Sequence, residues 1–132
     1  MSDLTDYAEN LLLNWMLTTE TVVRPTAWFI ALHTADPTEA GNVAEVVVED
    51  DADYARKAIT YDAAVGGQCL SAVQVAWTPA VGATAYQVTH ISICDAETAG
   101  NVLMKGALLV PRTIDNANPL ILSIGDIVAA LA

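Results

Sequence analysis

The densest group of side chains with metal-binding chemistry is an acidic run over Glu49–Asp53, which contains Asp50, Asp51 and Asp53. Clustered carboxylates supply the oxygen ligands of which Ca²⁺ takes six to eight. The run lacks the central glycine and the ligand spacing of an EF-hand loop. The sequence leaves two interpretations open, a Ca²⁺ site and a solvated acidic loop. It favours the solvated loop, so we expect no metal and no cofactor.

Imidazoles and thiols are few and widely separated. The chain has two histidines, His33 and His90, and two cysteines, Cys69 and Cys94, with no CxxC pair and no histidine cluster beside them. A zinc site needs three or four such ligands. We therefore expect each histidine to be a strand residue that bonds backbone or water. Because nothing indicates an oxidising compartment, we expect buried free thiols rather than a disulfide.

Sequence motifs of common enzymes are missing. The chain has no phosphate-binding glycine loop, no GxSxG elbow and no HExxH motif. A pair of carboxylates for glycoside hydrolysis would be invisible in a sequence, but it needs a deep cleft lined by aromatic groups. The chain has only three Trp, four Tyr and one Phe. We expect a protein that is not an enzyme.

Length and composition fit one domain over residues 1–132. The formal net charge is −11, from 16 acidic and 5 basic residues, which disfavours nucleic acid and anionic membranes as partners. Hydrophobic residues make up 54% of the chain, so it can form a core, yet no apolar run approaches the roughly 20 residues of a membrane span. The first residues carry acids where a secretory signal would carry bases, so we expect synthesis in the cytoplasm.

The chain opens with a helical pattern over about residues 3–17, which Ser2 or Thr5 can cap. Its apolar residues recur at three- and four-residue steps and form one stripe: Leu4, Tyr7, Ala8, Leu11, Leu12 and Trp15. Arg24-Pro25 ends any helical continuation. The stripe is expected to cover one opening of a sheet or to dock on a neighbouring subunit.

From about residue 26 the pattern becomes that of short strands. Trp28 and Trp77 lie in these patterns and are expected in the core. We expect Arg112–Ile114 to pair with the strand that follows it, a short edge strand at Val46–Val48, and either a strand or a helix in the tail at 125–132. The main strands are expected at Ala27–His33, Arg56–Tyr61, Cys69–Trp77, Tyr86–Cys94, Val102–Val110 and Leu120–Ile124. This order predicts a mainly β protein, an antiparallel β-sandwich (jelly-roll or Ig-like) at about 26–132 behind one N-terminal α-helix.

Five segments resemble, in chain order and at similar spacing, the motifs of a family of small proteins encoded by tailed bacteriophages. Tyr7–Leu13 resembles the family's LEN-x-LL opening, and Tyr54–Thr60 resembles its YARxAVT motif. Pro25–Thr38 resembles a hydrophobic strand that ends in DPT, Val88–Ala96 resembles VTHxGIFDA, and Gly100–Leu108 resembles GNLLxxGAL. None of these motifs is catalytic, so the specificity comes from the series, which runs nearly from end to end.

The chain departs from this family at three places. Ser92 stands where the family commonly has Gly, and Cys94 stands where it has Phe. The acidic stretch 45–53 replaces a loop that is richer in Gly and Ser. These changes leave the expected fold intact and bear on the binding details of that loop.

The resemblance implies a non-enzymatic virion structural protein, since members are labelled tail-fibre or virion structural proteins. We expect in the first place a capsid decoration (cement) protein that stabilises the head by binding neighbouring capsid subunits, because the chain is short and has no fibrous repeat. The alternative is a tail or tail-fibre component with a carbohydrate-binding role in host adsorption.

The expected location is the virion, and the expected partners are the major capsid protein or tail subunits together with further copies of this chain, with no nucleic acid and no membrane. Symmetric assemblies repeat the same modest contact many times. The surfaces expected to make these contacts are the helix stripe and the 46–48 edge, with Leu4, Leu11, Leu12, Trp15, Val46, Val47 and Val48.

Overall fold

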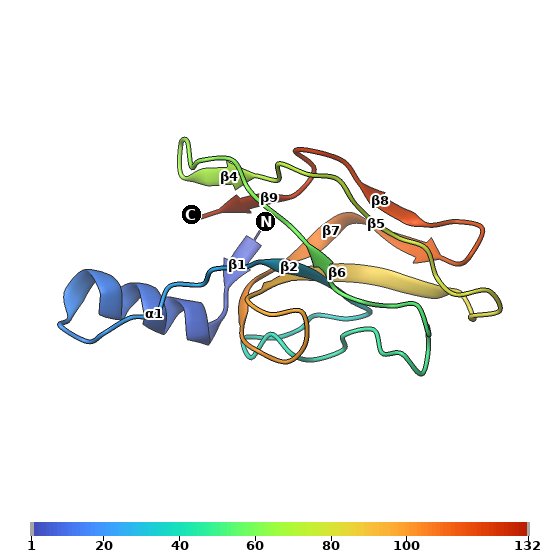
Figure 1. The fold of residues 1–132 in the computed structure, drawn as a ribbon, viewed down its shortest axis with the longest axis horizontal. Coiled ribbons are helices and arrows are strands. Elements are labelled where there is room, and N and C mark those ends of the chain that lie inside the picture. The colour runs from blue at the N-terminus through green and yellow to red at the C-terminus, as the bar shows by residue number, and fades with distance from the viewer. Residues whose placement is uncertain (1, 132) are drawn as a thin grey trace.

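The computed structural model describes residues 2–131, so Met1 and Ala132, the ends of the predicted domain, lie outside the described residues. Within 2–131 the chain forms one helix and nine strands, and every strand pair is antiparallel. Figure 1 shows the strands in two layers, with the helix set apart at one end. The predicted mainly β, antiparallel sandwich with an N-terminal helix is confirmed.

The larger layer is a five-stranded sheet in the order β1-β7-β6-β2-β3. Its centre is a long hairpin of β6 (Tyr86–Cys94) and β7 (Val102–Ile114), flanked by β2 (Phe29–His33). Two short edge strands complete it, β1 (Ser2–Leu4) and β3 (Lys57–Ala58). The hairpin forms as predicted, because two segments rich in apolar residues flank a turn at 95–100.

The second layer consists of two separate strand pairs. β4 (Gln68–Leu70) pairs with β9 (Val128–Ala130), and β5 (Val75–Trp77) pairs with β8 (Leu120–Leu122). The single strand predicted at Cys69–Trp77 is therefore wrong. The chain breaks at the buried Ser71, whose Oγ accepts the amides of residues 125 and 127 at 3.1 and 3.2 Å.

Two other expectations about the C-terminal half were settled by long-range pairing. Arg112–Ile114 does not pair with the strand that follows it, because β7 continues through Ile114 against Tyr86 and β8 pairs with β5 instead. The tail, left open between strand and helix, contains the strand β9. Both outcomes depend on partners more than twenty residues distant along the chain, which local alternation does not specify.

The main core lies between the two layers. Trp77 is its largest ring, 2% exposed, and its Nε1 donates to the carbonyl of Ala55 at 2.9 Å. Trp28 is partly buried against the same core, so both tryptophans pack where the sequence predicted. The buried members are Ile30, Leu32, Val46, Ile59, Val75, Trp77, Val88, Ile93, Ile114, Leu120 and Ile127.

The opposite face of the large sheet is covered by loops rather than by a further sheet. Ala31, Cys94 and Val102 form a small buried cluster there. The long acidic connection lies along β2, where the amide of Val46 donates to the carbonyl of Leu32 and residue 45 forms an isolated bridge with His33. The edge strand predicted at Val46–Val48 is thus wrong, because one bridge and a turn replace a ladder. Burial on both faces explains why β2 is apolar almost throughout.

The helix α1 (Asp6–Leu17) begins later than predicted, because residues 2–4 pair as β1 with Met104–Gly106. Thr5 is the N-cap, and its Oγ1 accepts the amide of Ala8 at 3.4 Å. Asp6 and Glu9 in the first turn match the positive end of the helix dipole. No helix within residues 2–131 is long and apolar enough to span a membrane.

Candidate functional site

The helix α1 and the extended segment that returns from it, residues 18–28, form a projecting arm (Figure 1). The arm is fixed to the body at its base. The hydroxyl of Thr5 donates to the carbonyl of Val102, and the amide of Asp6 donates to the carbonyl of Glu39. Ala8 is the buried residue of the helix. A helix of 12 residues is marginal in water on its own, so the far end of this arm has little to stabilise it.

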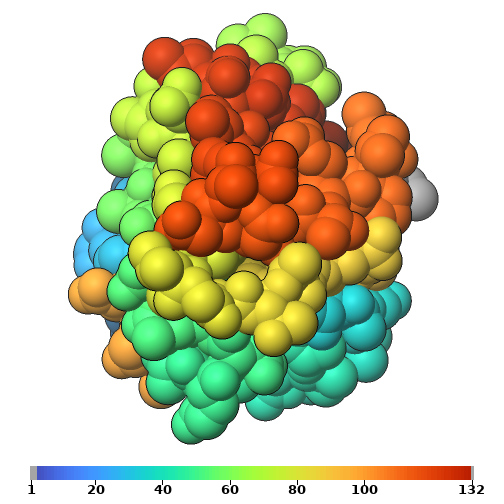
Figure 2. Space-filling model, turned by 90° about the vertical axis from the view of Figure 1, so that its right-hand side faces the viewer, coloured from blue at the N-terminus to red at the C-terminus, as the bar shows by residue number. Residues whose placement is uncertain are grey.

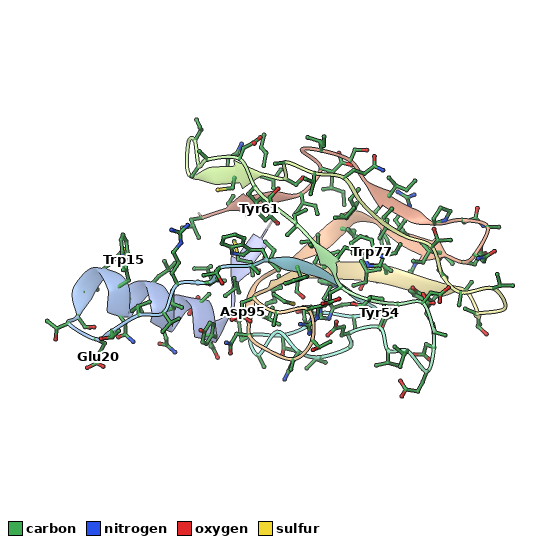
Figure 3. The ribbon with its side chains drawn as sticks, in the orientation of Figure 1. Trp15, Glu20, Tyr54, Tyr61, Trp77 and Asp95 are labelled. Atoms are coloured by element: carbon green, nitrogen blue, oxygen red, sulfur yellow. The ribbon has the colours of Figure 1, made fainter. Side chains whose placement is uncertain are left out.

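The far end of the arm is apolar and exposed. Trp15 is 70% exposed and Leu17 is 75% exposed, and in Figure 3 Trp15 stands out from the helix into open space. We define the arm tip as Leu13, Trp15, Met16, Leu17 and Val23, all exposed. Exposed apolar patches on soluble proteins are often protein–protein contact sites, so the arm tip is the candidate contact surface of this chain.

The predicted stripe is only partly where the sequence placed it. Leu4 on β1 and Leu11 and Leu12 in the middle of α1 are half-buried, whereas Trp15 lies at the exposed tip. The prediction from the sequence did not include Leu13, Met16 and Leu17 among the contact residues, although all three are exposed. Their signal was present: apolar residues occupy every side of the last two turns, which is the pattern of a helix that is covered all round.

The second predicted contact surface, at 46–48, is divided by the structure. Val46 is buried in the main core, while Val47 and Val48 are exposed beside the Glu45–Arg56 pair. Contact of these residues with a partner remains a prediction. In the structure the exposed residues of this predicted surface are Val47 and Val48, which lie beside a turn and not on the open edge of a strand.

An apolar pocket of about 410 Å³ opens next to the arm, between the large sheet and the β4–β9 pair. We call it the arm-side pocket. Its walls include Trp28, Tyr61, Cys69, Met104 and Ala129, with Arg24 among its lining residues. The Tyr61 hydroxyl is buried without a hydrogen-bond partner among the described residues, and burial raises its pKa. A buried hydroxyl of this kind normally finds a partner.

A second apolar groove of about 260 Å³ lies beside a bulge in β7. The pairing of β6 and β7 jumps from Val88 opposite Arg112 to His90 opposite Ala107, which pushes the intervening residues of β7 outward. Leu109 is fully exposed on this bulge. Figure 2 shows the orange segment of β7 standing out beside the red C-terminal strands.

The acidic connection is held in place by an ion pair beneath the large sheet. Arg56 contacts both carboxylate oxygens of Glu45, Nε to Oε1 and Nη2 to Oε2, each at 2.8 Å. Its Nη1 donates to the carbonyls of Ala96 and Ala99, so one guanidinium joins three chain segments. The Tyr54 hydroxyl donates to Glu45 Oε1 at 2.9 Å. Burial alone would raise the pKa of Glu45, but its hydrogen bonds from Arg56 and Tyr54 hold that pKa below its usual value.

Both histidines are strand residues, as predicted, but only His33 bonds the backbone, and the other bonded ring nitrogens contact side-chain hydroxyls. His33 Nδ1 lies 2.8 Å from the carbonyl of Val43 and must donate to it, so Nε2 accepts from the Ser92 hydroxyl at 2.7 Å. His90 Nδ1 lies 2.8 Å from the Thr89 hydroxyl.

In enzymes a histidine that accepts a hydrogen bond from a serine can activate that serine as a nucleophile. Here both residues of the pair are buried. His33 and Ser92 are at most 1% exposed, so no substrate reaches the hydroxyl. Cys94 beside them is also buried, and burial raises the pKa of its thiol. Cys69 and Cys94 are both free, as expected, although Cys69 is only half-buried.

We expect the unfolding free energy to fall as the pH drops below about 6.5, because burial lowers the pKa of His33 in the folded state. The unfolded chain then binds a proton that the folded chain resists, so stability is complete above 6.5 and declines towards the lower folded value. Urea denaturation at pH 7.5, 6.5 and 5.5 measures this. The variant His33→Gln should show a flatter profile over the same interval, and equal slopes would contradict the assignment.

The central carboxylate of the acidic run, that of Asp51, is buried and accepts hydrogen bonds from within the protein. Asp51 is 2% exposed, and its Oδ1 accepts the amides of Asp53 at 3.1 Å and Ala80 at 2.9 Å, while Oδ2 accepts the Tyr86 hydroxyl at 2.7 Å. No group of three His, Cys, Asp or Glu within residues 2–131 is arranged to hold a metal ion. Of the two interpretations, the geometry supports a loop anchored at Asp51.

We therefore expect Ca²⁺ and EDTA to leave the thermal midpoint unchanged, since a bound ion would raise it by mass action. Asp51→Ala should instead lower the unfolding free energy by about 2 kcal/mol, because three donors lose their acceptor. Differential scanning fluorimetry checks the first result and urea denaturation the second. A midpoint that rises with Ca²⁺ in the parent but not in the variant would show a cation site.

The comparison with known families gives one result. The family model described as podophage GP4 fiber I protein gp80 matches residues 3–130, nearly the whole chain. The chain belongs to this family. It is therefore a phage virion structural protein, as the resemblance implied. No curated protein matches the chain.

Proposed function

We propose that this virion protein is a non-enzymatic, fibre-type component of a podophage tail, made in the host cytoplasm and assembled through its projecting arm. The support for a location in the tail fibre is the family match, because the matching model describes a fibre protein and spans residues 3–130. This favours the tail-fibre alternative over the capsid decoration protein that the sequence first suggested.

The geometry supports a role in contact rather than in chemistry. The hydrogen-bonded pair of His33 and Ser92 is closed to solvent, while apolar side chains are exposed at the arm tip and on the β7 bulge. A protein that offers apolar projections and a sealed polar interior is suited to assembly. We propose tail proteins as its partners, with the arm as the first contact surface.

Labelled particles test this location directly. A short epitope inserted at the exposed turn containing Gly82, far from the arm, should place antibody at the fibres in electron micrographs of assembled phage. Label spread over the capsid faces would overturn the proposal in favour of decoration. A matched phage that lacks the epitope controls for antibody background.

Incorporation tests the role of the arm. Particles made without this chain should take up the purified parent protein and co-sediment with it, whereas Trp15→Ser should reduce the bound fraction at least about tenfold. Leu109→Ser serves as the matched control, because it removes an apolar side chain that is even more exposed than Trp15 and lies elsewhere on the molecule. Uptake of Trp15→Ser at the level of the parent protein would exclude the arm as the contact surface.

A further inference from the structure

The second layer of the fold is one interrupted ribbon. Its strand pairs, β4–β9 and β5–β8, follow each other along residues 68–77 and 120–130, and the backbone of Ser71 bonds residues 125 and 127 between them. We call these two segments the outer ribbon. It forms the upper layer in Figure 1, and parts of it appear in red and light green at the top of Figure 2. Its inward side chains, among them Val75, Trp77 and Leu120, belong to the main core.

The other side of the outer ribbon is also apolar, although it faces solvent. Leu70 lies opposite Val128 and Ala76 lies opposite Ile121, and along the strands these four alternate with buried or half-buried residues. Leu70, Val128 and Ile121 are 39%, 42% and 48% exposed. We call these four residues the outer face. A sheet with one solvated face normally carries polar residues there, whereas strands that are apolar on both faces are typical of a layer covered on both sides.

Charge is almost absent from this part of the molecule. Residues 63–85 contain no charged side chain and no histidine, and residues 116–131 contain only Asp126, in a chain with 16 acidic and 5 basic residues. The Asp126 carboxylate accepts the amide of Ser123 at 2.8 Å, within its own turn. A basic partner would be attracted to the acidic surfaces elsewhere on the molecule. Two copies of net charge −11 repel each other, and they meet with least repulsion across the outer face.

The exposed area suits a pair of copies. Val65 and Ile124, in the turns beside the outer ribbon, are 76% and 67% exposed. Together with Leu70, Ile121 and Val128 they expose an apolar area on the order of 400 Å². A stable contact buries about 800 Å² on each partner, of which about 500 Å² is apolar. The outer face and its turns supply most of that amount.

From these observations we infer that the outer face packs against the outer face of a second copy, as a two-fold dimer. A two-fold contact sets one surface against itself, so that surface must tolerate its own charge. A nearly uncharged apolar sheet face meets this condition, and two such faces pack about 10 Å apart. The inference goes beyond the proposed function, because the arm tip is no part of this contact. It is tested on purified protein, without any virion.

Analytical ultracentrifugation tests the association and its physical origin. The parent protein should show a dimer whose fraction rises with protein concentration. Raising NaCl from about 0.05 M to about 0.5 M should strengthen the dimer, because salt screens the repulsion between two acidic molecules. A protein that is monomeric at every concentration and both salt levels overturns the inference. A dimer that weakens with salt overturns it too, since ion pairs would then hold it.

Charged variants locate the contact. Ile121→Asp and Ile121→Lys should each weaken the dimer at least about tenfold, because each buries an unpaired charge in an apolar contact. Ile121→Lys makes the chain less negative, so its loss of association cannot come from overall repulsion. Ile121→Thr should also weaken the dimer and keeps a β-branched residue in the strand. Leu109→Asp and Leu109→Lys are the matched controls on the β7 bulge and should leave association unchanged.

A mixing experiment tests the two-fold arrangement. One protein carries Asp at both positions 70 and 121, and a second carries Lys at both. Each alone should be monomeric, and an equimolar mixture should dimerise, since opposite charges then face each other. Circular dichroism establishes that every variant is folded.

The remaining results count against the inference. A dimer that survives all three Ile121 substitutions, or that dissociates with the position-109 controls, would place the interface elsewhere and overturn it. A mixture that stays monomeric would contradict the face-to-face arrangement. None of these results bears on whether the protein lies in the fibre, which particle labelling decides.

Discussion

Replacing Trp77 with alanine will lower the unfolding free energy by about 3–5 kcal/mol, the usual loss for a large ring removed from a core. Trp77 is 2% exposed, packs between the two layers, and donates its Nε1 proton to Ala55 at 2.9 Å. The substitution leaves a cavity and an unpaired carbonyl together. Urea denaturation followed by circular dichroism measures the loss.

The same substitution at Trp15 is the matched control. Trp15 is 70% exposed at the arm tip, so Trp15→Ala in monomeric protein should change the unfolding free energy by no more than about 0.5 kcal/mol. Measurement at low protein concentration keeps association from contributing. Equal losses at positions 15 and 77 would show that the arm packs against the body, contrary to the structure.

Replacing Arg56 with alanine will cost about 3 kcal/mol, because it leaves the mostly buried Glu45 carboxylate without its counter-charge. It also removes the Nη1 group that donates to the carbonyls of Ala96 and Ala99, so the 95–100 turn loses its link to residue 56. Denaturation gives the free energy, and amide hydrogen exchange in 95–100 should rise locally.

Arg112→Ala is the control for charge. It changes the net charge by the same amount, but Arg112 is exposed on β7, so the loss should stay within about 0.5 kcal/mol. Arg56→Lys should fall between the two, because an ammonium cannot bond both Glu45 oxygens and two carbonyls in one plane. Equal losses in Arg56→Ala and Arg112→Ala would exclude the bidentate pair as a stabilising contact.

The sequence could predict that a helix carrying Trp15 is a candidate contact surface, but not which of its residues are exposed. A helix near residues 3–17 that carries Trp15 follows from apolar spacing, and docking on a neighbouring subunit was one of its two expected roles. Whether the stripe covers the sheet or projects from it depends on where the base of the helix is fixed. That is decided by the pairing of residues 2–4 with residues 104–106 of β7, a contact between segments far apart in the chain.

The arm-side pocket could not be predicted at all. Arg24, Trp28, Tyr61, Cys69 and Ala129 come from separate segments that share no sequence signal, and only the packing of β9 over the large sheet brings them together. The Glu45–Arg56 pair and the anchoring of Asp51 are likewise contacts between loops. Composition showed that the acidic stretch exists, but the partner of each carboxylate is a property of the folded chain.

Local pattern by itself determined the elements that depend on neighbours in the chain. The β6–β7 hairpin, the buried strand β2 and the existence of the helix follow from alternation, capping and turn residues, which act over a few residues. Tertiary structure decided which short strands pair, where Cys69–Trp77 breaks, and which apolar residues stay exposed. The physical reason is that burial and long-range hydrogen bonds are satisfied only after distant segments meet, so their outcome is not encoded at any one position.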